Sequence, residues 1–204
     1  MRIKVCGITS LEDALLCASL GVDALGFNFY SASPRCLEPR KAREIIRRLP
    51  PFITCVGVFV NEPDPRDARE KAREAGVEWL QLHGDESPEY CSRLAGSPLI
   101  KALRLGDRLP PELGDYDVRA ILLDTHDDER FGGTGRTFRW DLALPVAKLR
   151  PVILAGGLSP ENVAAAIITA KPYAVDVCSG IEAAPGRKDP ARLEAFVREV
   201  RNAG

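Results

Sequence analysis

Eight short apolar runs recur along the chain, and segments with helical periodicity separate most of them. The runs span residues 2–5, 22–29, 53–60, 77–83, 99–105, 119–125, 151–157 and 173–180. Each is almost continuously apolar, which is the pattern of parallel strands that helices cover on the outside. Eight strand–helix units in 204 residues leave about 25 residues per unit. The pattern therefore predicts an α/β fold, a compact (β/α)8 TIM barrel that spans residues 1–204 as a single domain.

An open doubly wound sheet is the alternative architecture. Such a sheet usually has fewer strands, and the GxGxxG fingerprint of its nucleotide-binding members is missing after the first run. The barrel is therefore the favoured interpretation.

The predicted helices share a starting motif, a capping residue followed by proline. It occurs at Glu38-Pro39, Asp64-Pro65, Ser87-Pro88, Ser159-Pro160 and Asp189-Pro190. Proline is favoured at the first helical position because its missing N–H would have no partner there. We therefore expect a helix to begin at each of these prolines. After the run 99–105, only a turn or two of helix is expected.

Charge and hydropathy exclude several classes of protein. Lysine and arginine number 28, aspartate and glutamate number 29, and no long basic run occurs, so neither nucleic acid nor a membrane surface is an expected partner. No apolar stretch is long enough to span a bilayer. The N-terminus MRIKVCGITSLED lacks the apolar region and cleavage site of a signal peptide, so a cytoplasmic protein is expected. The six cysteines form no CxxC pair and only two histidines accompany them, so neither a structural metal site nor a disulfide framework is expected.

The C-terminal ends of the predicted strands carry an unusual number of polar residues and glycines. They hold Cys6-Gly7, Asn28 to Tyr30, His83-Gly84, Arg104, Asp124, Gly156-Gly157 and Ser179-Gly180. In a barrel these ends form the face where active sites lie, and the loops after the last two strands commonly hold a phosphate. Backbone N–H groups of the glycine turns could bind such an anion, although these glycines could also serve only tight turns. A phosphorylated small molecule is the expected ligand.

Four side chains near this face have both a chemical and a structural interpretation. Cys6 could act as a base or nucleophile once its pKa is lowered, or be an inert buried thiol. Asp124 either caps the following loop or acts as an acid. His83 could be a hydrogen-bonded structural histidine, and Arg35 could bind a carboxylate or lie solvated at the surface. Residues 126–136 contain a glycine cluster that could form a lid or an ordinary flexible loop.

Six motifs, in order along the chain, resemble the phosphoribosylanthranilate isomerase family. They are KVCGIT, GFNFYSASPR, QLHGDES, LLDT followed by GGTGRTFRW, LAGGLSPENV and VDVCSGIEAAPGRKD, and they run from the first strand to the last helix. The resemblance implies an aldose–ketose isomerase of tryptophan biosynthesis with the (β/α)8 fold. It implies conversion of N-(5-phosphoribosyl)anthranilate to 1-(2-carboxyphenylamino)-1-deoxyribulose 5-phosphate by an Amadori rearrangement, with no cofactor and no metal.

Matched motif by motif, the resemblance also assigns roles to residues of this chain. It implies Cys6 as the general base that takes the proton from C2 of the ribose, and Asp124 as the general acid that protonates the ring oxygen. It places Arg35 near the anthranilate carboxylate, and His83 and Asp176 beside the substrate. The phosphate-binding positions that it implies are Gly156, Gly157, Ser179 and Gly180.

The chain departs from the usual family pattern at Cys36, Cys178, Asn28 and Arg139. None of these replaces an implied catalytic residue. One alternative is the histidine-pathway isomerase that performs the same rearrangement, but that family has an aspartate where this chain has Cys6. Another is a non-catalytic barrel that binds a phosphorylated ligand, which predicts degraded catalytic positions, yet Cys6 and Asp124 are both present. The sequence leaves open whether the chain is a monomer or a homodimer.

Overall fold

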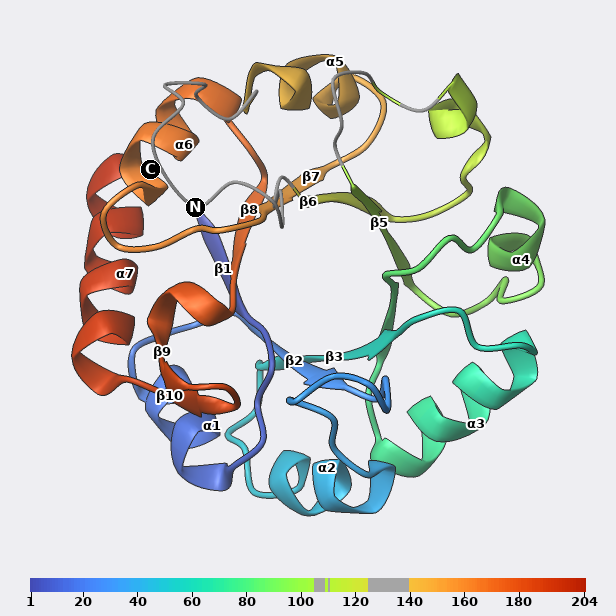
Figure 1. The fold of residues 1–204 in the computed structure, drawn as a ribbon, viewed down its shortest axis with the longest axis horizontal. Helices are drawn as coiled ribbons and strands as arrows, with labels where there is room; N and C mark the ends of the chain where they lie inside the picture. Colours follow the sequence, from blue (N-terminus) through green and yellow to red (C-terminus); the bar gives the residue numbers. More distant parts are fainter. Residues whose placement is uncertain (105–108, 110, 125–139) are drawn as a thin grey trace.

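A closed barrel of eight parallel strands forms the centre of the computed structural model, which describes residues 1–104, 109, 111–124 and 140–204 (Figure 1). The strands are β1 (Arg2–Val5), β2 (Ala24–Asn28), β3 (Thr54–Phe59), β4 (Trp79–Leu82), β5 (Leu99–Arg104), β6 (Ala120–Asp124), β7 (Val152–Ala155) and β8 (Ala174–Val177). They are hydrogen-bonded in sequence order, and β8 pairs with β1 to close the ring. The predicted (β/α)8 fold is confirmed.

Helices surround the ring of strands in Figure 1. They are α1 (Leu11–Ser19), α2 (Pro39–Ile46), α3 (Pro65–Ala75), α4 (Pro88–Ser92), α5 (Ala143–Ala147), α6 (Val163–Ala170) and α7 (Pro190–Ala203). Four of the predicted prolines begin α2, α3, α4 and α7. The prediction for Ser159-Pro160 is wrong, because α6 begins at Val163 with Asn162 as its N-cap. The Asn162 side chain accepts from Ser159 N at 2.8 Å and donates to Gly157 O at 2.9 Å, which holds this segment in a turn.

Two connections depart from the simple repeat. Between β5 and β6 the described chain forms only the 3-10 helix η1 (Pro111–Asp115), in agreement with the short helical turn expected there. A second 3-10 helix, η2 (Trp140–Leu142), precedes α5. After β8, η3 (Ser179–Ile181) leads into a hairpin of β9 (Glu182–Ala184) and β10 (Arg187–Lys188), which the sequence patterns did not predict.

Side chains of the strands fill two separate layers. The larger apolar cluster lies between strands and helices, since it combines residues of both, Ala68 and Phe196 among the latter. The smaller cluster fills the barrel interior, because its members alternate along the strands with members of the larger one. Its members are Val56, Ile100, Ala102, Ala120, Leu122, Ile153, Ala155 and Ala174. Lys4 and Asp176 also point inward, because their strand neighbours on either side belong to the larger cluster.

Three further predictions concern membranes, metals and the lid. In the described ranges, with gaps at 105–108, 110 and 125–139, no helix is long and apolar enough to cross a membrane. The same part of the chain contains no group of three His, Cys, Asp or Glu side chains placed to hold a metal ion. The expected lid at residues 126–136 and the departure at Arg139 lie outside the described residues.

Candidate active site

Cys6 follows β1 directly, at the C-terminal end of the barrel. Its backbone N–H donates to Val177 O of β8 at 2.9 Å, which extends the pairing of the two strands by one residue. Its side chain shares the inner face with Lys4, two positions earlier. The Sγ atom lies against Gly26 of β2, where an added Cβ would be 2.8 Å from it. Gly26 therefore makes room for the thiol at the inner wall of the barrel.

The surroundings of Cys6 favour its thiolate. A hydrogen bond from the Cys178 thiol lowers the pKa of Cys6, burial raises it, and the charges of Lys4 and Lys188 lower it again. The result is a pKa for Cys6 well below its usual value. The same hydrogen bond raises the pKa of Cys178 far above its own usual value, so Cys178 stays protonated and remains the donor.

The buried thiols elsewhere in the fold behave in the opposite way. Burial raises the pKa of Cys17 to about 12 and the pKa values of Cys55 and Cys91 to about 11. All three belong to the apolar layer between strands and helices, where a protonated thiol packs as a small hydrophobe. Cys6 differs from these cysteines because it accepts a hydrogen bond from Cys178 and lies near positive charges.

His83 links the ends of β4 and β6. His83 Nε2 lies 3.1 Å from Asp124 Oδ2, and Gln81 Nε2 lies 2.7 Å from Nδ1 of the same ring. With the Gln81 amide donating to Nδ1, the ring proton is on Nε2 and is donated to Asp124. The ring therefore orients the carboxyl of Asp124. Strands β7 and β8 separate Asp124 from Cys6 around the ring, so the two predicted catalytic residues lie on different walls of the mouth.

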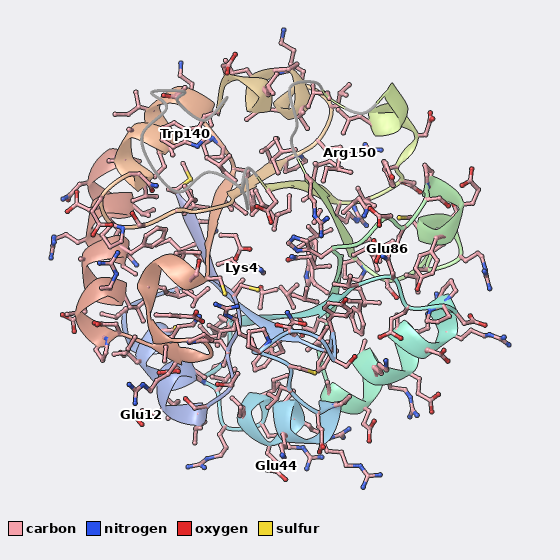
Figure 2. The ribbon with its side chains drawn as sticks, in the orientation of Figure 1. Lys4, Glu12, Glu44, Glu86, Trp140 and Arg150 are labelled. Carbon is pink, nitrogen blue, oxygen red and sulfur yellow. The ribbon has the colours of Figure 1, made fainter. Side chains whose placement is uncertain are left out.

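Asp176 of β8 forms an ion pair with Lys4 of β1 inside the barrel. Lys4 Nζ donates to Asp176 Oδ1 at 2.9 Å, and the two side chains are 4% and 7% exposed. Figure 2 shows Lys4 near the middle of the ring of strands. Burial raises the pKa of Asp176 to about 7, against the opposing effect of the Lys4 charge. The structure places this carboxyl against Lys4, and its contact with a substrate stays a prediction.

Glu182 of β9 joins Arg35 to Lys188. Arg35 Nε donates to Glu182 Oε1 at 2.9 Å while Nη2 donates to Oε2, the two-pronged contact that suits a guanidinium and a carboxylate. Lys188 Nζ donates to Glu182 Oε1 at 2.9 Å and to Cys6 O at 2.6 Å. The side chains of Lys188 and Glu182 are buried. The β9–β10 hairpin therefore ties the loop that carries Arg35 to the main chain of Cys6.

The glycine turns after β7 and β8 pack against each other. Gly156 and Gly157 have φ values of 83° and 61°, the left-handed conformation that favours glycine. A Cβ on Gly180 would collide with the carbonyl oxygen of Leu158, so the second turn also requires glycine. Ser179 begins η3 in that turn. The four predicted phosphate positions lie on neighbouring loops, and phosphate binding by them stays a prediction.

The structure thus brings the predicted residues to one end of the barrel, while sequence reasoning missed Lys4, Glu182 and Lys188. Lys4 carried a usable signal, because it stands two residues before Cys6 in an otherwise apolar strand and so shares its face. Glu182 and Lys188 stand in the stretch IEAAPGRKD, where nothing local indicates that the chain turns back as a hairpin onto Cys6.

Comparison with known proteins points to one family. The family model described as N-(5'phosphoribosyl)anthranilate (PRA) isomerase matches residues 3–199. The N-(5'-phosphoribosyl)anthranilate isomerase of Geobacter sulfurreducens is 50% identical over 203 residues, which cover 98% of each chain. The crystal structure of phosphoribosyl anthranilate isomerase from Thermotoga maritima matches with a TM-score of 0.90 at 44% identity, covering 99% of each chain. A phosphoribosyl anthranilate isomerase in complex with reduced 1-(o-carboxyphenylamino)-1-deoxyribulose 5-phosphate matches with a TM-score of 0.88 at 41% identity, covering 99% of each chain.

Proposed function

Because the chain belongs to the N-(5'-phosphoribosyl)anthranilate isomerase family, we propose that it isomerises N-(5'-phosphoribosyl)anthranilate with Cys6 as general base and Asp124 as general acid. It is an aldose–ketose isomerase of tryptophan biosynthesis. The observation that carries the two roles is that Cys6 is surrounded by groups that favour its thiolate, at the same barrel mouth where His83 orients Asp124. An aldose-to-ketose shift needs one acid and one base held around the sugar, and this arrangement supports that chemistry.

In the proposed reaction, Asp124 acts first. Its carboxyl protonates the furanose ring oxygen, the bond from that oxygen to C1 breaks, and the anthranilate nitrogen forms a protonated Schiff base with C1. The contact between His83 and Asp124 supports this step, because it fixes the direction in which the carboxyl points.

Cys6 acts in the second step. Its thiolate removes the proton from C2, and the electron pair of that bond forms a C1–C2 double bond while the Schiff base becomes an amine. The resulting enol then becomes a ketone at C2: its hydroxyl proton goes to the carboxylate of Asp124 and the thiol of Cys6 gives its proton to C1, which returns both groups to their starting states. The lowered pKa of Cys6 supports this role, because only the ionised thiol can accept the proton.

We assign the binding roles as follows. Arg35 contacts the anthranilate carboxylate through Nη1, the nitrogen that it does not use on Glu182, and Glu182 keeps the guanidinium in place. His83 and Asp176 face the sugar. The phosphate is bound by backbone N–H groups of the two packed loops at Gly156, Gly157, Ser179 and Gly180. Residues 1–204 act as a single barrel domain on this small phosphorylated substrate, and the cytoplasmic location and the choice between monomer and homodimer stay predictions.

Turnover of N-(5'-phosphoribosyl)anthranilate by the purified protein tests the proposal, with loss of substrate fluorescence as the readout. Cys6→Ala and Asp124→Asn are each expected to lower kcat by about 100-fold or more, the scale of general acid–base catalysis. Cys55→Ala is the matched control, because Cys55 is a buried thiol on the outer face of β3. It should leave kcat unchanged. No turnover by the wild type, or unchanged turnover in both Cys6→Ala and Asp124→Asn, contradicts the proposal.

A further inference from the structure

The barrel interior buries a complete ion pair, Lys4 with Asp176. Taking two charges out of water is expensive, and apolar side chains of similar volume often stabilise a fold at least as well. Apolar side chains, most of them from β5, β6 and β7, fill much of this interior, so the fold has that alternative available. Stability alone is therefore a weak reason for the pair.

The ammonium of Lys4 and the thiol of Cys6 approach each other at Gly26. An added Cβ on Gly26 would lie 2.8 Å from Cys6 Sγ and 3.2 Å from Lys4 Nζ. The two atoms are consequently within about 6 Å of each other, the range over which a positive charge favours the ionised form of an acid. Because position 26 is glycine, no side chain of β2 stands between them. Lys4 is thus placed to act on Cys6 directly.

The Lys4 ammonium interacts with two acidic groups, the carboxyl of Asp176 and the thiol of Cys6. It donates to Asp176 at 2.9 Å and faces Cys6 at Gly26. Burial lowers the pKa of Lys4, and the charges of Asp176 and Cys6 more than offset that effect, so the ammonium stays charged. Burial raises the pKa of Asp176 to about 7, so this carboxyl is only partly ionised near neutral pH. Part of the Lys4 charge is then balanced by Cys6.

Other polar or charged groups also face Cys6 from several elements. They are Cys178 after β8, Lys188 of β10, His83 after β4 and Arg35 in the loop after β2. Lys188 and Arg35 share the carboxylate of Glu182, and Lys188 donates to the main-chain oxygen of Cys6. These two cations share one carboxylate, so the network keeps a net positive charge, and the charge of Lys188 also lowers the pKa of Cys6. Lys4 differs because its carboxylate partner titrates near neutral pH.

We propose that Lys4 is a positioning residue whose ammonium holds Cys6 as the thiolate that takes the substrate proton, with Asp176 keeping the ammonium in place. This inference rests on the proposed role of Cys6 as the base. It assigns Lys4 no contact with the substrate. It also explains why glycine stands at position 26, since any side chain there would push the thiol away from the ammonium.

The pH dependence of Cys6 alkylation by iodoacetamide tests the inference, read by mass spectrometry of the peptide that carries Cys6. Lys4→Met removes the charge and keeps the length of the side chain. The midpoint of alkylation should rise by about 1 pH unit or more, the usual scale for loss of a neighbouring opposite charge. The apparent pKa on the acid side of the pH profile of kcat/KM should rise by the same amount. Lys4→Arg restores the charge and should return both values toward the wild type.

Lys101→Met is the matched control. Lys101 is also buried and pairs with Glu86 at 2.8 Å, but it points out of the barrel because it alternates with interior residues of β5. It should leave the Cys6 midpoint in place. Asp176→Asn is a second variant that keeps Lys4: its amide oxygen can still accept from Lys4 Nζ and hold the ammonium in place, while the competing negative charge is removed, so the midpoint should fall. A midpoint that stays in place in folded Lys4→Met, rises equally in Lys101→Met, or rises in Asp176→Asn overturns the inference.

The alkylation readout keeps this inference separate from the proposed function. If Cys6→Ala retains turnover, Cys6 is not the base, yet the midpoint in Lys4→Met still reports whether Lys4 controls the thiol. If Cys6→Ala is inactive and the midpoint in Lys4→Met does not move, the base assignment stands and the role of Lys4 fails.

Discussion

Two buried lysine–carboxylate pairs lie on opposite faces of the same ring of strands. Lys4 pairs with Asp176 inside the barrel, and Lys101 pairs with Glu86 between the barrel and its helices. The N···O distances are 2.9 and 2.8 Å, and all four side chains are buried. In Figure 2, Lys4 lies near the middle of the ring and Glu86 lies on its outer side. The geometry of the pairs themselves therefore does not distinguish them.

The neighbours of the outer pair complete its hydrogen bonding. Lys101 Nζ also donates to Leu82 O at 3.3 Å and to Gly84 O at 2.6 Å. Glu86 accepts from Asn61 N at 2.8 Å and from Gly84 N at 2.9 Å. Backbone groups thus satisfy both charges within one closed network, which holds the loop after β4 in place.

The inner pair has a second acid beside it instead. Lys4 faces the Cys6 thiol at Gly26, and Asp176 shares the same ammonium. A buried ion pair therefore stabilises the local chain conformation where backbone groups complete its hydrogen bonds. Where a second titratable group completes the pair, the same interaction can adjust the charge of a reactive side chain.

Removal of each lysine is the strongest test of this difference. Lys101→Met leaves Glu86 buried without its cation, which should lower the free energy of unfolding by about 3–5 kcal/mol. Lys4→Met leaves Asp176, which can take up a proton because burial already raises its pKa to about 7. At pH 6 the loss should therefore be smaller, about 1–3 kcal/mol. Urea denaturation of both variants at pH 6 measures the two losses.

A double variant provides the control. In Lys101→Met with Glu86→Gln, the amide oxygen can still accept from one of the two backbone N–H groups, which bond to different oxygens of Glu86, and the neutral amide needs no cation. Part of the lost stability should return. If Lys4→Met is as costly as Lys101→Met at pH 6, Asp176 does not become neutral there and the two pairs are equivalent.

The barrel could be predicted because each strand–helix unit carries its own local signal. Apolar runs and capping residues before proline are read within a few positions, and units of this length close into a barrel. The β9–β10 hairpin was missed because strands of three and two residues leave no periodic pattern. The start of α6 was misplaced because the Asn162 side chain bonds to local backbone groups and holds a turn where the motif predicted helix.

For the site, the positions could be predicted but most of the partners could not. Strand ends mark the mouth of a barrel, so Cys6 and Asp124 could be named from the sequence. The ion pair of Lys4 with Asp176 joins residues 172 positions apart. It depends on the pairing of β8 with β1, and no local sequence pattern predicts which charged side chains form an ion pair between these strands. Only the shared face of Lys4 and Cys6 was visible in advance.

The pH dependence of stability in Asp176→Asn tests whether the inner carboxyl titrates near neutral pH. Burial raises the pKa of Asp176 from 3.8 to about 7, so the folded state binds this proton more tightly than the unfolded chain does. The stability that the proton confers is fully present below about pH 4 and is lost as the pH rises through 7. The free energy of unfolding of the wild type, relative to Asp176→Asn, should therefore fall between pH 5 and 7, by up to about 3 kcal/mol.

Urea denaturation of both proteins at pH 5, 6, 7 and 8 gives this difference directly, because asparagine does not titrate. A difference that is constant, or that grows with pH, would mean that Asp176 is ionised throughout. The inner pair would then be a permanently ionised structural pair like that of Lys101 and Glu86, and the charge of Lys4 would not be shared with Cys6.

Substitution of two glycines on neighbouring strands tests whether the inner and outer faces of the barrel differ in their effect on kcat. A Cβ on Gly26 would enter the inner face 2.8 Å from Cys6 Sγ, and a Cβ on Gly57 would enter the outer face 2.9 Å from two aromatic rings and a valine. Both contacts are too close, so each alanine should cost about 1–3 kcal/mol of stability through overpacking. Only Gly26→Ala displaces the thiol from Lys4, so it alone should lower kcat, by about 10- to 100-fold.

Unfolding in urea and turnover, measured on the same two variants, separate these consequences. Similar losses of stability with unequal losses of kcat are what the comparison requires, because overpacking can occur on either face while contact with Cys6 belongs to the inner face. If Gly57→Ala lowers kcat as much as Gly26→Ala does, strain on the outer face reaches the mouth through the strands themselves. The outer face would then affect catalysis as well as stability, and the proposed difference between the two faces would be wrong.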